Sequence, residues 1–183
     1  KRVFVGVEDP NPRHAGAGLA VLRRAGVEVV RGVEEEKCRV LNEAFFKWVA
    51  KGVPFVLLKM AMTLDGKIAT ASGESKWITG AVARRRVHRL RQWADAVLIG
   101  GGTARADRPS LSVRDHKGPL RQPRRIVVSK SLTKKDLEGI RGGDGLPKPD
   151  LFSFSSPADW AECMRNLAAE NVLSVLIEGG GEV

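Results

Sequence analysis

The sequence predicts an α/β fold in which the buried strands of an open sheet alternate with helices. Three apolar runs of strand length support this prediction, at residues 55–58, 94–102 and 172–177. Amphipathic helical spacing over residues 81–94 and 158–171 separates these runs along the chain. Strands that alternate with amphipathic helices are typical of a sheet covered by helices, so the chain has the pattern of a layered α/β domain.

Length and composition set limits on this fold. At 183 residues the chain has room for one full domain and a piece of another, and an apolar fraction of 43% can supply a core. No apolar run approaches the length of a membrane span, and no signal peptide is present, so secretion is not expected. The chain starts at Lys1 without a methionine, so any targeting segment would lie upstream. Cys38 and Cys163 form no C-x-x-C pair, which indicates a reduced compartment.

The net charge of +10 calls for an anionic partner. Nucleic acid is one candidate, but the chain has no Lys/Arg tail, no zinc-finger spacing, no basic strand interleaved with aromatic residues and no tyrosine. An anionic small substrate and a phosphorylated cofactor explain the basic residues with fewer assumptions. The sequence therefore favours a small-molecule site over a nucleic-acid or membrane surface.

The first 52 residues predict strand, helix, strand and helix. Glycines and prolines punctuate the stretch, and the last helix has acids in its first turn, lysine at its end and glycine as its stop. The predicted elements are a strand at 1–7, a helix at 16–25, a strand at 27–30 and one helix at 34–51.

Two features of this stretch have plain structural interpretations. Gly16 and Gly18 half-match a dinucleotide-binding fingerprint, but the third glycine position is Val21, so helix packing is the better interpretation. Phe45 and Trp48, with Phe46 beside them, have the helical spacing of core residues.

From residue 53 onward the elements alternate regularly. Thr79 stands where it could cap the helix that follows it. The segment 130–150 is rich in lysine, glycine and proline and is expected to lie on the surface. The remaining predicted elements are a strand at 55–58, a helix at 81–94, a strand at 94–102, a loop at 115–123, strands at 125–129 and 151–154, a helix at 158–171 and a strand at 172–177.

Polar residues follow these strands in a particular order. The strand at 55–58 leads into K-x-A-x-T-x-D-G-K at 59–67 and S-G-E-S-K-W-I-T at 72–79, and the strand at 94–102 ends in three glycines. Open α/β sheets bind ligands beyond their strand ends, and glycines there let backbone N–H groups approach a phosphate. Ordinary connections and plain turns are the alternatives for each loop taken alone.

The combined motifs resemble one enzyme family. The two motifs above, A-D-R-P-S-L-S-V-R at 106–114 and E-G-G after the last strand resemble the reductase domain of the bifunctional riboflavin-biosynthesis deaminase–reductase, whose fold is like dihydrofolate reductase. V-G-V-E-D-P-N-P at 5–12 resembles the end of its cytidine-deaminase-like α/β domain. The resemblance implies a deaminase remnant over 1–52 and an NADPH-dependent reductase domain over 53–183, incomplete at its C-terminus.

The zinc site of the deaminase is not in this sequence. It needs H-x-E and P-C-x-x-C, whereas His14 is followed by Ala15 and Gly16 and neither cysteine has a partner. Deaminase activity is therefore not expected of this chain, and zinc would belong only to the absent part. His14, His88 and His116 have no visible partners for catalysis.

The resemblance implies a reaction and a set of site residues. The family reduces the ribosyl group of 5-amino-6-(5-phosphoribosylamino)uracil to a ribityl group with a hydride from NADPH. The positions of Lys59 and Asp65 would orient the open sugar or relay a proton. Most arginines of the helix 81–94 are expected in solvent, Arg91 excepted. The positions implied for substrate are Ser75, Arg91, Leu111, Arg114 and Glu178, and those for NADPH are Ala61, Trp77, Thr103, Asp107, Gly180 and Gly181; Ser129 is a weaker candidate, and no metal ligand is implied.

Other interpretations remain open at this point. The chain could be a related dihydrofolate-reductase-like enzyme with another pyrimidine or pterin substrate, or a non-catalytic fragment of the bifunctional enzyme. A basic nucleic-acid-binding module would show steeply salt-dependent affinity. The resemblance also implies a homodimer in the full-length protein and a location in the bacterial cytoplasm or a plastid.

Overall fold

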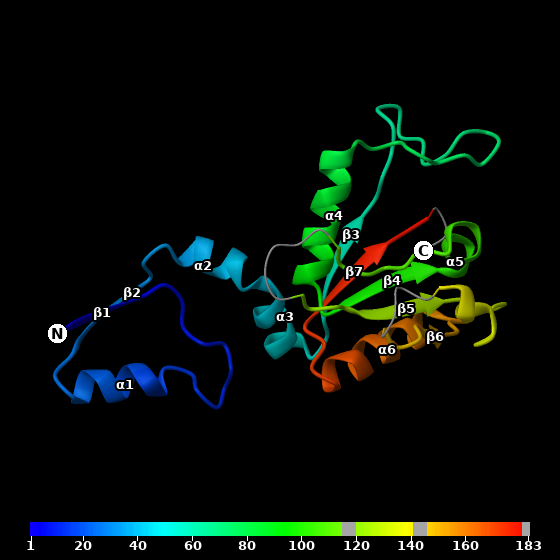
Figure 1. The fold of residues 1–183 in the computed structure, drawn as a ribbon. Helices are drawn as coiled ribbons and strands as arrows, with labels where there is room; N and C mark the ends of the chain where they lie inside the picture. Colours follow the sequence, from blue (N-terminus) through cyan, green and yellow to red (C-terminus); the bar gives the residue numbers. More distant parts are fainter. Residues whose placement is uncertain (115–119, 141–145, 181–183) are drawn as a thin grey trace.

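A computed structural model describes residues 1–114, 120–140 and 146–180, which form two sheets (Figure 1). The smaller sheet pairs β1 with β2, and the larger has the order β3-β7-β4-β5-β6. The strands are β1 (Arg2–Val5), β2 (Glu28–Arg31), β3 (Phe55–Lys59), β4 (Ala96–Gly100), β5 (Arg124–Val128), β6 (Asp150–Phe152) and β7 (Ser174–Glu178). The helices are α1 (Ala17–Arg24), α2 (Glu35–Leu41), α3 (Glu43–Lys51), α4 (Ala81–Trp93), α5 (Gly101–Asp107), the 3-10 turn η1 (Asp136–Gly139) and α6 (Pro157–Ala169).

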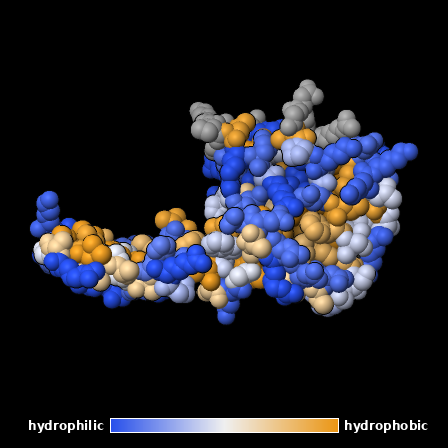
Figure 2. All heavy atoms as spheres, turned by 90° about the horizontal axis from the view of Figure 1, so that it is seen from below, coloured by the Kyte–Doolittle hydropathy of each residue, from blue (hydrophilic) through white to orange (hydrophobic). Residues whose placement is uncertain are grey.

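The N-terminal unit, residues 1–52, extends away from the larger sheet (Figures 1 and 2). The strand, helix and strand follow in the predicted order, and the structure adds that β1 and β2 pair in parallel with α1 connecting them. All 52 residues are described and none is buried, and apolar side chains such as Phe4 and Leu41 face solvent. The strands and α1 form as predicted, but the unit encloses no core of its own. A domain boundary at residue 52 stays a prediction.

The predicted helix 34–51 is wrong in one respect, because the structure has two helices there. α2 ends at Leu41 and α3 begins at Glu43, with Asn42 between them at φ −111°. The Asn42 amide Nδ2 donates to the Cys38 carbonyl at 2.8 Å, and such local side-chain bonds compete with the helical ladder. α3 ends at Gly52 as expected, where φ is +64°.

Trp48 of α3 contacts the helix α6, and the aromatic residues of α3 do not fill a core. None of the residues of α3 is fully buried, although the sequence placed Phe45, Phe46 and Trp48 inside. The Trp48 indole Nε1 donates to the carbonyl of Ala168 in α6 at 2.9 Å. α3 therefore contacts the layer that α6 forms.

The larger sheet is parallel throughout, and its last strand lies inside it. β7 pairs with β3 on one side and with β4 on the other. Because parallel strands end at the same edge of a sheet, Lys59 at the end of β3 and Glu178 at the end of β7 become register partners. Residues far apart in sequence are thereby gathered at one edge.

The core of this sheet lies in two layers, one on each face. Val97 and Ile99 of β4 pack toward the side that contains Leu90 of α4. The alternate residue Leu98 packs with Leu167 of α6 on the other side. This alternation along one fully buried strand confirms the layered α/β fold.

Three predictions about this unit need correction. The cap of α4 is the backbone of Gly80, with no side-chain bond from Thr79. Only Gly100 of the glycine run lies in the strand, since Gly101 begins α5. The segment 130–150 is not simply surface, because Leu137 and Ile140 are each 1% exposed and complete the core on the α4 side.

Candidate functional site

A cavity of about 860 Å³ opens at the carboxyl ends of β3 and β7, between α4 and the start of α5. The residues assigned from sequence come together here, although they derive from five separate stretches of the chain. Open α/β sheets place ligands at this edge, and the volume is in the range of small-molecule sites. The predicted site residues that line the cavity are Lys59, Ala61, Ser75, Trp77, Arg91, Thr103, Asp107, Leu111, Arg114, Glu178 and Gly180.

The predicted residues Asp65 and Gly181 do not belong to this set. Gly181 lies outside the described residues. Asp65 is exposed in a tight turn, where the Thr63 hydroxyl donates to its carboxylate at 2.5 Å, and it does not line the cavity. Gly66, at φ +79°, completes the turn. A direct catalytic role for Asp65 therefore stays a prediction.

Arg91 and Glu178 form a nearly buried ion pair at the floor of the cavity. Arg91 Nε and Nη2 donate to the two carboxylate oxygens of Glu178 at 2.5 and 2.8 Å, and each side chain is 11% exposed. Arg91 Nη1 donates to the carbonyl of Ser112 at 3.0 Å. The sequence assigned both residues to substrate; here they bind each other, so the Arg91 guanidinium already has partners at all three nitrogens.

The charge that remains available in the cavity is positive. Lys76 pairs with Asp107 at 3.4 Å, so both lining carboxylates have cationic partners. Within the described ranges, the side chains of Lys59, Arg85 and Arg114 form no ion pair. Unpaired cations in a concave site attract anions such as phosphate groups.

The loop before α4 is held by an arginine of that helix. The Arg84 guanidinium carbon lies 4.3 Å from the centre of the Trp77 ring, and Arg84 Nη1 donates to the Thr79 carbonyl at 2.6 Å. A cation over an aromatic face is attractive. The Trp77 side chain is nevertheless 72% exposed, so its other surface can contact a ligand.

Sequence reasoning missed part of the lining. Arg85 and His88 were left on a solvated face or without a partner, yet both line the cavity. The statement that His88 has no partner is wrong, because its Nδ1 accepts the backbone N–H of Arg114 at 3.2 Å. The helical spacing contained a signal, because residues three and four apart share a face and positions 84, 85, 88 and 91 lie on the same side of α4. His116 lies outside the described residues.

Gly180, in the loop after β7, leaves space beside Thr103 that a ligand could occupy. A Cβ atom at Gly180 would lie 2.9 Å from the Thr103 hydroxyl oxygen, so only glycine leaves this space open. Thr103 and Gly180 thus form one wall from α5 and the loop after β7. Ser129 does not line the cavity; its Oγ accepts the backbone N–H groups of Ser131 and Leu132.

A parallel sheet covered on both faces, with a cationic cavity at its strand ends, defines a small-molecule-binding α/β protein. Among the described residues, no helix is both long and apolar enough to cross a membrane. The chain belongs to the RibD C-terminal domain family, whose sequence profile matches residues 54–183.

Curated relatives agree with this assignment. The chain is 39% identical over its whole length to the riboflavin biosynthesis protein RibD of Actinobacillus pleuropneumoniae, covering 54% of that protein. It is 51% identical over 72% of its length to RibD of Synechocystis, covering 35% of that protein. The chain therefore spans about half the length, or less, of these two relatives.

Solved structures give the same fold over the full chain. A Thermotoga maritima diaminohydroxyphosphoribosylaminopyrimidine deaminase/5-amino-6-(5-phosphoribosylamino)uracil reductase matches with a TM-score of 0.81 and 36% identity, covering 100% of this chain and 54% of that one. Acinetobacter baumannii RibD matches with a TM-score of 0.78 and 31% identity, over 98% of this chain and 55% of its own. Both sheets of the present structure thus have counterparts in this family.

Proposed function

We propose that this chain carries the reductase step of riboflavin biosynthesis, the reduction of 5-amino-6-(5-phosphoribosylamino)uracil to its ribitylamino form with NADPH. The observation that supports this proposal is that the family motif residues line one cavity together with Arg85, and that Lys59, Arg85 and Arg114 there form no ion pair with any described residue. A phosphorylated substrate and a phosphorylated cofactor both suit that charge. The absence of a Ser-His-Asp arrangement in the sequence agrees with a reaction that needs no nucleophile.

On the substrate side, we assign the phosphate to Arg114 and Arg85, because the guanidinium of Arg91 is engaged by Glu178. Lys59 stands at the end of β3, in register with Glu178, and its ammonium would orient the opened sugar or give up a proton to it. Ser75 and Leu111 complete the lining on this side. Arg91 and Glu178 would then act by shaping the floor of the site.

On the cofactor side, Thr103, Gly180 and Asp107 would hold NADPH, together with Trp77 and Ala61, which line the same cavity. Bound NADPH would supply the hydride. The chain's own contribution is to hold substrate and cofactor together and to exclude water from the space between them. Binding of the cofactor beside Trp77 should quench the fluorescence of that exposed indole.

The first test is turnover. Wild-type protein should oxidise NADPH only when the phosphoribosylamino pyrimidine is present. Lys59→Met keeps most of the side-chain volume and removes the ammonium, and should lower kcat by about 100-fold or more, the usual contribution of a positioned proton donor. Lys51→Met, at the exposed end of α3, is the matched control and should leave kcat unchanged. Asp65→Asn in the same assay tests the sequence-based role of Asp65.

The second test is cofactor binding, followed by tryptophan fluorescence with NADPH and NADH. Saturable quenching that prefers NADPH and is lost in Trp77→Phe would support the proposal. A folded wild-type chain that neither binds NADPH nor turns over would favour the alternative of a non-catalytic fragment. Turnover of a pterin in place of the phosphoribosylamino pyrimidine would favour the other alternative.

Three further parts of the proposal need separate measurements. A deamination assay with added zinc should be negative for this chain, since the zinc motif is missing. Analytical ultracentrifugation of the full-length protein should show a homodimer. Localisation in the bacterial cytoplasm or a plastid is also a proposal, for which fractionation of source cells is the test.

A further inference from the structure

Residues 110–114, which we call the clamped segment, carry the cavity residues Leu111 and Arg114 without belonging to any helix or strand. Leu111 and Val113 are 1% and 2% exposed, so backbone groups of this segment are taken out of water. A buried N–H or carbonyl that lacks a partner is costly, and a regular strand would supply partners from its neighbour. The clamped segment needs another source.

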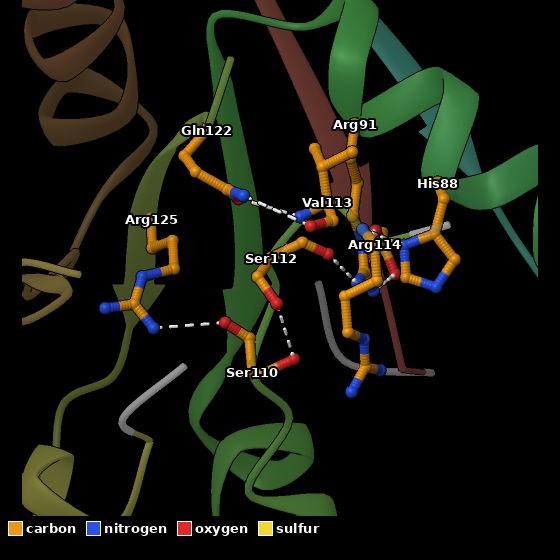
Figure 3. A network of polar contacts seen from close by, with 9 residues as sticks. His88, Arg91, Ser110, Ser112, Val113, Arg114, Gln122 and Arg125 are labelled. Atoms are coloured by element: carbon orange, nitrogen blue, oxygen red, sulfur yellow. Dashed lines mark hydrogen bonds and ion pairs between the residues drawn. The ribbon is translucent and has the colours of Figure 1, made fainter. Parts of the chain in front are cut away.

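Side chains provide those partners from two directions (Figure 3). Gln122, just before β5, accepts from the Val113 N–H at 2.8 Å and donates to the Val113 carbonyl at 3.1 Å, as a neighbouring peptide group would. From the same side, Arg125 Nη1 donates to the Ser110 carbonyl at 3.0 Å. From α4, Arg91 donates to the Ser112 carbonyl and His88 accepts the Arg114 N–H.

The clamps hold a backbone that the sequence alone would not favour. Leu111 has φ +54°, a left-handed conformation that is unfavourable for a residue with a Cβ atom. Such conformations persist where the surroundings over-determine them, and they cluster at binding sites. The side chain of Leu111 reaches the cavity in this conformation, and Arg114 follows three residues later.

We propose that Gln122 is a positioning residue for substrate: its amide replaces a missing strand neighbour at Val113 and so fixes where Arg114 enters the cavity. Gln122 does not line the cavity itself, so it acts on the ligand only through the clamped segment. Its effect falls on substrate and not on NADPH, because the cofactor residues Thr103 and Asp107 belong to α5 and Gly180 follows β7, outside the clamped segment. This role of Gln122 rests on the proposed function, in which Arg114 binds the substrate phosphate.

The test compares wild type with Gln122→Met, which keeps the length of the side chain and removes both hydrogen bonds. Ribose 5-phosphate serves as the substrate-side probe and NADPH as the cofactor probe. Gln122→Met should weaken ribose 5-phosphate binding and raise KM for the pyrimidine about tenfold, the size expected from two lost hydrogen bonds. The NADPH affinity and kcat should change by less than about twofold, because residues that share no contacts have nearly independent effects.

Ser156→Ala is the control for a general loss of stability. It removes the capping box of α6, a helix with no residue in the cavity lining, and should lower stability without changing KM. Unchanged ribose 5-phosphate affinity in folded Gln122→Met would overturn the proposal, and so would equal loss of both ligands.

Amide hydrogen exchange tests the hydrogen bonds of the clamped segment independently of enzyme activity. The Val113 and Arg114 amides should be protected in wild type although they lie outside regular structure, and Val113 should exchange faster in Gln122→Met. Unprotected amides in wild type would overturn the clamp even if the enzyme is active. A wild-type chain with protected amides that binds neither probe would refute the proposed function and the substrate role of Gln122, and would leave the clamp as a structural feature.

Discussion

Removal of Arg91 should destabilise the protein far more than removal of an exposed arginine or lysine. Its guanidinium makes two bonds to Glu178 and one to the Ser112 carbonyl, and both side chains of the pair are 11% exposed. Breaking a buried pair from one side costs about 3–5 kcal/mol, because a carboxylate remains without a partner. Some exposure remains here, so we expect about 3 kcal/mol for Arg91→Met.

Urea denaturation measures this change. With a slope of about 2 kcal/mol per molar urea, a loss of 3 kcal/mol lowers the midpoint by roughly 1.5 M. Lys148→Met is the matched control, since the Lys148–Glu138 pair joins side chains that are 58% and 50% exposed. It should cost less than about 1 kcal/mol.

A double variant separates loss of the pair from loss of packing. Arg91→Met combined with Glu178→Leu removes both charges, and replacement of a buried pair by apolar groups is often neutral. The double variant should therefore be more stable than Arg91→Met alone. Additive losses in the double variant, or an Arg91→Met midpoint equal to that of Lys148→Met, would refute the reasoning.

Three other predictions concern the sheet and its helices. Gly101→Ala should lower the urea midpoint by the equivalent of about 1–3 kcal/mol, because the new Cβ would lie 2.4 Å from Ser129 Oγ, whereas Gly18→Ala meets no atom within 4 Å and should not destabilise. The Asp159 carboxylate accepts the backbone N–H groups of Ser155 and Ser156, and these hydrogen bonds lower its pKa below 3.8. The folding stability that results is present above pH 3.8 and is lost as the pH falls through the lowered pKa of the folded state. Denaturation at pH 2 to 5 should therefore show a weaker pH dependence for Asp159→Asn than for wild type. Arg125→Met should cost about 2–4 kcal/mol in the same urea assay, because the carbonyls of Ser110, Ile140 and Pro147 lose their donor at a site where Arg125 is 5% exposed; a loss below about 1 kcal/mol would contradict this.

The layered fold could be predicted because its central strands consist mainly of apolar residues. β4 and β7 are almost completely buried, and such runs stand out in a sequence. The order of the strands could not be predicted, since nothing local shows that β7 inserts between β3 and β4. The break at Asn42 was missed for a similar reason: one side-chain bond to Cys38 decides it, within a pattern that otherwise reads as helix.

The site could be predicted as a set of residues, but not as a set of contacts. Motif positions such as Lys59 and Thr103 do line the cavity. Arg91 and Glu178 lie 87 residues apart and meet only because β7 inserts between β3 and β4, so no local pattern indicates that Glu178 is the partner of Arg91. The contacts of Gln122 and His88 could not be predicted, because both side chains bind backbone atoms and every residue offers such atoms as partners.

The N-terminal unit described above has a consequence for how the chain melts. Heat capacity and enthalpy of unfolding come largely from surface that the native state keeps from water, and residues 1–52 bury no side chain fully. A calorimetric peak of this protein therefore belongs almost entirely to the five-stranded sheet. The β1–β2 hydrogen bonds can break with little heat absorbed. The thermogram would therefore measure the unfolding of the larger unit, and unfolding of residues 1–52 would contribute almost no signal.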